Sequence, residues 1–270
     1  MVSRTHAVVV ILPRLEDDVT AVRLLALRIF DALLTEGVFH FQSFFIIQNR
    51  LIMSETQSTG IPRIGDAAPS FVASTTHGEL TLHDYNRDHW IVFFAHPADF
   101  TPVCTTELVE FAKRKPEFDA LGTRLIGVSI DSIHAHLAWV HNVKQQTGVL
   151  LDFPIIADLD TKVAQAYGLI HPGESSTAAV RAVFVIDPKG IIRAIIYYPL
   201  NVGRNIDEVL RLLKGLQTAD AQACALPANW TEGQHVVVPP PKTWSEVGQH
   251  QGKGYEETDF YLLKRPLERA

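Results

Sequence analysis

A cysteine that follows an apolar segment is the residue of this chain best placed to do chemistry. The 270-residue sequence has two cysteines, and one of them, Cys104, lies just after the apolar run Trp90–Ala95 and opens a predicted helix. The first turn of a helix presents unpaired backbone N–H groups and the positive end of the helix dipole. Both favour a thiolate over a thiol, so we predict that Cys104 is a nucleophile.

The residues that precede Cys104 fit this role. Thr101 lies three positions earlier, which is close enough for its hydroxyl to hydrogen-bond to the sulfur or to an oxygen bound there. Pro97 and Pro102 stiffen the loop and lack N–H donors, which limits water near the sulfur. The competing interpretation is that Cys104 is a small buried core residue, the common role of a free cysteine.

The order of these residues resembles a known family. Pro97-x-x-x-Thr101-x-x-Cys104 resembles the active-site motif of the peroxiredoxins of the AhpC/TSA type, and Asp-Phe-Thr-Pro-Val-Cys-Thr-Thr-Glu is similar to their one-cysteine subfamily. The resemblance runs from about Pro62 to Tyr261. Further matching stretches are Gly65–Pro69, Gly127–Asp131, Phe153–Asp158, Arg181–Asp187, Gly203–Asn205, Pro227–Trp230 and Val238–Pro240.

The resemblance implies an activity and three site residues. It implies a thiol-specific peroxidase that reduces hydrogen peroxide and alkyl hydroperoxides through a sulfenic acid at Cys104, in antioxidant defence. Thr101 matches the hydrogen-bonding partner, and Arg181 matches the guanidinium beside sulfur and peroxide. Arg181 opens an apolar run, where a charge is costly unless it is paired. No cofactor and no metal is expected, because sulfur itself carries the redox chemistry.

Three further residues are weaker candidates for the same site. Glu107 lies one turn after Cys104 and could orient Arg181 or Arg204, although a glutamate in a first helical turn is also typical of a plain helix start. His96 is a candidate for the substrate pocket, and a structural histidine is an equally good interpretation of it.

The second cysteine bears on how the enzyme is recycled. Cys224 precedes the C-terminal segment, whereas two-cysteine relatives carry their resolving cysteine near an Asp-aromatic-aromatic stretch. Here that stretch is Glu256–Leu263, which contains no cysteine. We therefore expect an external thiol reductant of the thioredoxin, glutaredoxin or glutathione kind. Cys224 is expected to be structural, with a resolving role as the alternative.

Other functions are less well supported by the sequence. An oligomeric holdase chaperone or a redox sensor with little turnover is the main alternative, because relatives form dimers and larger rings. A disulfide reductase would need Cys-x-x-Cys, and Glu107 occupies the second cysteine position. Some one-cysteine relatives carry a phospholipase serine in Gly-x-Ser-x-Gly, but His89 stands there in this chain.

A metal site is also not expected. His134, His136 and His141 are predicted to lie on a polar helix face, without an acidic or cysteine partner at ligand spacing. The formal net charge of −6 argues against nucleic-acid binding. With two cysteines, the chain is no disulfide scaffold, and we expect a cytoplasmic location.

The elements that must position these residues alternate between strand and helix. This alternation predicts an α/β protein, and the resemblance implies a thioredoxin-like fold with helices on both faces of the sheet. The Asp187–Gly190 turn joins two strands closely enough for a hairpin, so the sheet should be mixed. The expected strands are Trp90–Ala95, Leu125–Ile130, Ile155–Ala157, Val180–Ile186 and Ile191–Tyr198. The expected helices are Thr105–Leu121, Ser132–Gln146, Thr161–Tyr167 and one that starts near Asn205.

The chain divides into three parts by composition. Residues 1–60 are predicted to be an extension and linker outside the fold, and Met53 is a second candidate start. Gly37–Asn49, the longest uncharged stretch of residues 1–52, is too short to span a membrane. Residues 61–220 form the predicted peroxiredoxin domain. Residues 221–270 are a small loop-rich arm that we expect to pack across the partner of a homodimer, which could assemble further into a decamer.

Overall fold

The computed structural model describes residues 61–249 and 253–267. The predicted extension, residues 1–60, lies outside them, and so does the second candidate start, Met53. Within the described part of the chain, no helix has both the length and the apolar content that a membrane crossing requires.

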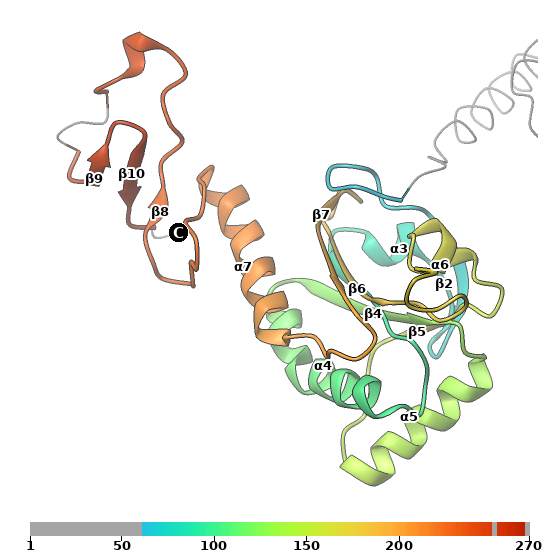
Figure 1. The fold of residues 1–270 in the computed structure, drawn as a ribbon. Coiled ribbons are helices and arrows are strands. Elements are labelled where there is room, and N and C mark those ends of the chain that lie inside the picture. The colour runs from blue at the N-terminus through green and yellow to red at the C-terminus, as the bar shows by residue number, and fades with distance from the viewer. Residues whose placement is uncertain (1–60, 250–252, 268–270) are drawn as a thin grey trace, which may run out of the picture. The chain divides into compact units, whose positions relative to one another are not determined.

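A seven-stranded mixed sheet forms the centre of the fold (Figure 1). Its strand order is β2-β1-β5-β4-β3-β6-β7. Strand β3 pairs in parallel with β4, and β4 with β5, whereas the remaining pairs are antiparallel. The strands are β1 (Val72–Thr75), β2 (Gly78–Thr81), β3 (Trp90–Ala95), β4 (Thr123–Ser129), β5 (Ile155–Ala157), β6 (Arg181–Ile186) and β7 (Ile192–Tyr198).

The five strands expected from apolar runs are all present, which confirms the predicted mixed sheet. Strand β4 begins two residues before the expected Leu125, because Thr123 already pairs with Trp90 of β3. The β1–β2 hairpin was not expected. Its strands are four residues each and only partly apolar, so they carry no clear period-2 pattern.

Helices cover both faces of the sheet, as predicted. Helix α4 starts at Pro102, three residues before the expected Thr105, since proline suits the first helical position. Ser132 and Asn205 cap α5 and α7 by accepting from Ala135 and Glu208 backbone N–H groups. The helices are α3 (Leu82–Asn86), α4 (Pro102–Ala120), α5 (Ile133–Thr147), α6 (Lys162–Ala166) and α7 (Ile206–Gln222).

Two apolar cores lie on the two faces of the sheet. On one face, side chains of α4, α5 and α7 pack against Val92 and Phe94 of β3. On the other, side chains of α3 and α6 pack against Ile91 and Phe93. The alternation along β3 is that of a strand buried on both sides. Helices α4 and α7 run side by side on the first face (Figure 1). Helix α4 carries Cys104 and Glu107, and Arg204 lies two residues before α7.

The C-terminal arm is more ordered than its sequence suggests. It contains a three-stranded sheet in the order β8-β10-β9, built from β8 (Val236–Val237), β9 (Glu256–Asp259) and β10 (Leu262–Arg265), with a short 3₁₀ turn at Trp244–Glu246. The predicted small C-terminal arm is therefore present, and its strands are an addition that the sequence analysis did not predict. Strand β8 pairs with the distant β10, and β9 is exposed throughout, so no apolar pattern marks these strands.

The arm packs against the end of α7 through a buried tryptophan. Trp230 is fully buried, and its carbonyl accepts a hydrogen bond from Arg211 of α7 at 3.1 Å. Gly215 makes the close approach of Leu226 possible, because a Cβ at that position would lie 2.9 Å from Leu226 Cδ1. A glycine in the middle of this helix is therefore explained by packing. The arm thus gains part of its core from its own chain.

Candidate active site

Cys104 lies in the first turn of α4, as predicted. Thr101 is the N-cap residue, Pro102 is the first helical residue, and Cys104 is the third. The Cys104 side chain is completely buried, in the core between the sheet and α4, α5 and α7. Backbone N–H groups of a first turn have no partner within the helix, so the sulfur lies where a helix best stabilises negative charge.

Arg181 contacts the sulfur directly. Its Nη1 donates to Cys104 Sγ at 3.3 Å and to Glu107 Oε2 at 2.6 Å. Its Nε and Nη2 both donate to the Leu200 carbonyl, at 2.9 and 2.8 Å. Strands β3 and β6 are antiparallel, so the first residue of β6 lies beside the end of β3, from which the Cys104 loop departs. The guanidinium is 3% exposed, so water screens its attraction to a thiolate only weakly.

Glu107 joins Arg181 to a second buried arginine. Its Oε1 accepts from the backbone N and the Nε of Arg204, at 2.8 and 2.9 Å, and its Oε2 accepts from Arg204 Nη2 at 2.7 Å. Burial alone would raise the pKa of Glu107, but the charges and hydrogen bonds of Arg204, together with Arg181, hold that pKa below its ordinary value. Glu107 therefore orients both arginines and is not merely a first-turn glutamate.

Arg204 is fixed on every side. Its Nη1 donates to the carbonyls of Ala95 and Ala182, at 2.8 and 3.1 Å. Its guanidinium carbon lies 5.3 and 5.5 Å from the ring centres of Phe94 and Phe111. These contacts connect the ends of β3 and β6 to the start of α7, and they leave Arg181 as the arginine that reaches the sulfur.

The loop before Cys104 is tightly held. Pro97 is buried, and the Thr101 hydroxyl donates to the Ala98 carbonyl at 2.8 Å rather than to the sulfur. With its proton used in this way, the Thr101 oxygen is left as a hydrogen-bond acceptor. Phe100, between them, has a φ of 55°, a strained conformation for a bulky residue, and its side chain is 56% exposed. Strain of this kind is concentrated at functional sites.

His96 belongs to a buried polar cluster that the sequence did not reveal. Its Nε2 lies 2.8 Å from Asp99 Oδ1, and His136 Nδ1 lies 2.6 Å from Asp99 Oδ2. Placing His136 on a polar helix face was wrong: it is fully buried, whereas His134 and His141 are exposed. A sequence clue was available, because His136 and Trp139 are three residues apart and so share a helix face.

The same three residues have the ligand types that a metal ion requires. One atom of each of His96, Asp99 and His136 lies within 4.8 Å of the others. The hydrogen-bond distances of 2.6 and 2.8 Å, however, are those of side chains bound to one another. We therefore treat the cluster as a hydrogen-bond chain.

Cys224 lies at the far end of α7 from the site. Arg204, which binds Glu107, stands two residues before α7, and Cys224 stands two residues after it. A helix of 17 residues is about 25 Å long, whereas the Cα atoms of a disulfide lie within about 7 Å. Burial raises the pKa of the Cys224 thiol, which disfavours its thiolate. Cys224 and Cys104 are thus not brought together within one protomer.

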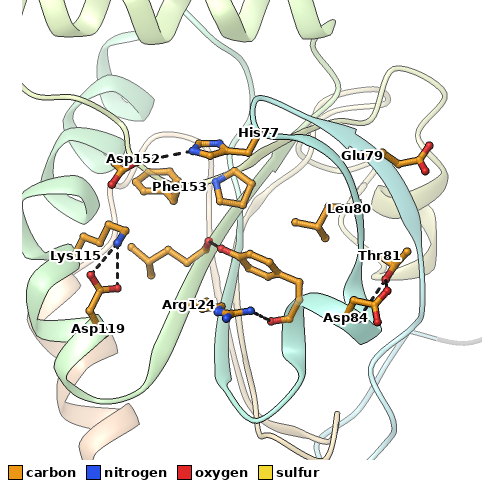
Figure 2. Close-up of a pocket in the computed structure, with 13 residues that line it drawn as sticks. His77, Glu79, Leu80, Thr81, Asp84, Lys115, Asp119, Arg124, Asp152 and Phe153 are labelled. Carbon is orange, nitrogen blue, oxygen red and sulfur yellow. Dashed lines mark hydrogen bonds and ion pairs between the residues drawn. The ribbon is translucent and has the colours of Figure 1, made fainter.

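A cavity of about 610 Å³ lies at another part of the fold. Figure 2 shows the residues that line it. Its lining includes Arg124 and Leu125 at the start of β4 and Phe153 before β5, which is the sheet end opposite the one that Cys104 follows. Its charges are largely paired, as in the Lys115–Asp119 ion pair at 2.8 Å. The adjacent Tyr85 hydroxyl donates to Leu125, and burial raises the pKa of Tyr85 to about 12. The cavity includes none of the residues that contact the sulfur.

Comparisons with known proteins agree with this geometry. The AhpC/TSA family model matches residues 64–195, and the model of the C-terminal domain of 1-Cys peroxiredoxin matches residues 215–254. A peroxiredoxin of Aquifex aeolicus is 50% identical over 217 residues, which is 77% of this chain and 98% of that protein.

Two solved structures share the fold. A yeast mitochondrial 1-Cys peroxiredoxin superposes with a TM-score of 0.70 at 41% identity, covering 76% of this chain and all of that one. Peroxiredoxin 6 of Arenicola marina superposes with a TM-score of 0.71 at 34% identity, covering 77% of this chain and all of that one. With a buried cysteine at a helix start, an arginine on its sulfur and these relatives, the chain belongs to the peroxiredoxin family of thiol peroxidases.

Proposed function

We propose that this protein is a one-cysteine peroxiredoxin that reduces hydrogen peroxide and alkyl hydroperoxides through a sulfenic acid at Cys104. The observation that carries the proposal is the 3.3 Å contact between Arg181 Nη1 and Cys104 Sγ in a site closed to solvent. A guanidinium on the sulfur favours the thiolate and can also stabilise the negative charge that develops on the departing oxygen.

The chemical step follows from these positions. The Cys104 thiolate attacks the terminal oxygen of the peroxide, so that an S–O bond forms while the O–O bond breaks. The sulfur loses two electrons, the products are a sulfenic acid and an alkoxide or hydroxide, and a proton from solvent completes the alcohol or water. The Thr101 hydroxyl donates its hydrogen bond to the Ala98 carbonyl, so its oxygen can accept a hydrogen bond from the O–H of the bound peroxide.

Recycling requires a thiol from outside the protomer. Cys224 is a helix length away from Cys104, and its thiol is biased toward the protonated form. The yeast relative has a thiol resolving mechanism via glutathione/thioredoxin systems. We infer that a small thiol or a thioredoxin-like or glutaredoxin-like protein reduces the sulfenic acid here, in a cytoplasmic setting in which both cysteines remain free.

We further propose that the protein acts as a homodimer. The arm exposes Trp244, Phe260 and Tyr261, of which Trp244 is 89% exposed. Exposed aromatic residues of this size mark interaction surfaces. We propose that a second copy of the chain covers these aromatic residues. Sedimentation tests this: the wild type should be a dimer, and the Trp244→Ser variant should dissociate more readily.

The first test of the mechanism is mass spectrometry after one equivalent of hydrogen peroxide. We expect a dimedone-reactive sulfenic acid on Cys104 and no Cys104–Cys224 bond. Detection of that disulfide in most molecules would refute the one-cysteine route. A protein that consumes no peroxide would refute the peroxidase function itself.

The second test concerns Arg181. Lysine carries one ammonium group and cannot reach the sulfur, Glu107 and Leu200 together, as the guanidinium does. We expect Arg181→Lys to lower the second-order rate constant of peroxide reduction by roughly 10²–10³, the effect of losing one oriented transition-state donor. Stopped-flow tryptophan fluorescence measures this rate.

Arg193→Lys is the matched control for this variant. Arg193 lies on β7 and pairs with Asp187 and Asp220, with 27% of its side chain exposed. We expect its replacement to leave the peroxide rate unchanged. Equal rates for the two variants would show that the contact between Arg181 and the sulfur is not functional.

A further inference from the structure

The carbonyl of Leu200 holds the guanidinium of Arg181 in place. Arg181 Nε and Nη2 both donate to this oxygen, at 2.9 and 2.8 Å, and Nη1 is left for Cys104 Sγ and Glu107. A guanidinium is planar and rigid, so two bonds to one oxygen fix the direction in which Nη1 points. The position of the Leu200 carbonyl therefore decides whether Nη1 reaches the sulfur.

Leu200 lies in a turn rather than in the sheet. Strand β7 ends at Tyr198, which pairs with Arg181 of β6, and the turn of residues 199–202 follows on the way to α7. The backbone hydrogen bond between the first and last residues of this turn is long, at 3.4 Å, and the second half of the turn is exposed to solvent. An exposed turn of this kind needs an anchor from elsewhere in the chain to keep one position.

The carboxylate of Glu174 supplies such an anchor. The backbone N–H of Leu200 donates to Glu174 Oε2 at 3.1 Å. A carboxylate binds a backbone N–H more strongly than water does, because the hydrogen bond is charge-assisted. Leu200 is thus held by Glu174 through its N–H, and it holds Arg181 through its carbonyl. Glu174 itself is exposed, so its side chain adds nothing to the apolar core of the domain.

The loop that carries Glu174 is itself held in place. Its ends, Leu169 and Val180, are joined by a backbone hydrogen bond of 2.9 Å. At its tip, the backbone N–H of Glu174 donates to the His171 carbonyl at 2.8 Å. The His171 ring packs against that of Tyr197 on β7, with the ring centres 5.3 Å apart. The loop is therefore fixed to the same strand that leads into the Leu200 turn.

We propose that Glu174 is a positioning residue of the peroxidase site, which acts on Cys104 through Leu200 and Arg181. The proposal rests on the proposed function, because it concerns the contact between Arg181 and the sulfur. Without Glu174, Arg181 stays in the site, since Glu107 still binds it, but its Nη1 is directed less precisely. A small misplacement of an oriented group is enough to slow a reaction, even when its cause lies outside the site.

Two substitutions of Glu174 test the role of its hydrogen bond. Glu174→Ala removes the acceptor, whereas Glu174→Gln keeps a side-chain oxygen that can accept from Leu200. We expect Glu174→Ala to lower the second-order rate constant of peroxide reduction roughly three- to tenfold, the range of one net hydrogen bond. Glu174→Gln should restore most of that rate. Stopped-flow tryptophan fluorescence measures both variants, and a glutamine variant as slow as the alanine variant overturns the proposal.

Glu232→Ala is the matched control. Glu232 is also an exposed carboxylate with a partner, Lys214 at 2.9 Å, but it lies in the C-terminal arm. We expect this variant to reduce peroxide at the rate of the wild type. Both alanine variants should unfold within a few degrees of the wild type, because neither glutamate is buried. A slower reaction in Glu174→Ala then reflects the site and not a loss of folded protein.

A double-mutant cycle with Arg181→Lys tests the route by which Glu174 acts. Lysine has no planar fork for the Leu200 carbonyl to orient. We therefore expect Glu174→Ala to change the rate little when it is introduced into the Arg181→Lys protein, whereas independent effects would multiply. A further three- to tenfold loss in that background overturns the proposal. A Glu174→Ala variant as fast as the wild type overturns it as well.

Amide hydrogen exchange at Leu200 tests the contact without reference to activity. The Leu200 amide should exchange more slowly in the wild type and in Glu174→Gln than in Glu174→Ala. Equal exchange in the wild type and Glu174→Ala overturns the proposal while leaving the peroxidase function intact. A wild type that reduces no peroxide refutes the proposed function, and this proposal with it, before any variant is compared.

Discussion

Cys104→Ser is expected to abolish peroxide reduction. Serine fills nearly the same buried volume. Its hydroxyl, however, is not ionised beside Arg181 and has no sulfur to form the S–O bond of a sulfenic acid. The loss should be at least about a thousandfold, as for removal of other catalytic nucleophiles. Steady-state consumption of hydrogen peroxide with dithiothreitol as reductant measures it, and circular dichroism should show an unchanged fold.

Cys224→Ser is the matched control, since it removes the only other thiol of the chain. We expect its turnover to equal that of the wild type, because Cys224 lies beyond the far end of α7. A loss of turnover in this variant would show that Cys224 takes part in resolution across protomers. Substantial turnover in Cys104→Ser would remove the basis of the proposed mechanism.

Glu107→Gln is expected to be the most destabilising polar substitution at the site. Glu107 is the shared partner of Arg181 and Arg204, and all three side chains are at most 3% exposed. Loss of the carboxylate charge removes the anion that the two buried guanidinium groups share, which costs about 3–5 kcal/mol of unfolding free energy. Denaturation at neutral pH, followed by tryptophan fluorescence, measures this difference.

Glu208→Gln provides the comparison for that stability measurement. Glu208 pairs with Arg211 on α7, but both side chains are more than 30% exposed. Exposed pairs contribute about 0–1 kcal/mol. If the two glutamine variants are equally stable, the Glu107 cluster is not a net source of stability.

The same carboxylate predicts a pH dependence. The pKa of Glu107 in the folded protein is below its ordinary value of 4.5. The group therefore contributes its full stability above pH 4.5, and this contribution is lost as the pH falls from there through the folded-state pKa. The wild type should lose its stability advantage over Glu107→Gln across that acid range, and an advantage independent of pH would contradict the assignment.

Much of the site could be predicted because its chemistry is local in sequence. Thr101 and Cys104 share one loop and one helix start, so the position of the sulfur followed from the apolar strand before it. Arg181 stood out as a charge at the start of an apolar run. The contact between Arg181 and Glu107 depends on strand order. The sequence therefore left open whether Glu107 orients Arg181 or Arg204.

What the sequence did not reveal depends on non-local packing. His136 lies between the exposed His134 and His141 on α5, and its buried partner is the Asp99 carboxylate, 37 residues earlier in the chain. Strands β8 and β10 of the arm pair across more than 20 residues, and β8 is only two residues long. Neither the burial of His136 nor the pairing of the arm strands produces a hydrophobic periodicity that could be recognised in a single sequence.

The sharing of Glu107 between two arginines has a consequence over the whole turnover cycle. Two guanidinium groups and one carboxylate carry one excess positive charge, which a thiolate at Cys104 would cancel in the proposed mechanism. Oxidation to the uncharged sulfenic acid leaves that excess uncompensated in a buried site. In that mechanism an incoming reductant in its anionic thiolate form would restore electroneutrality as it approaches, so the arginine proposed to promote oxidation would also attract the species that reverses it.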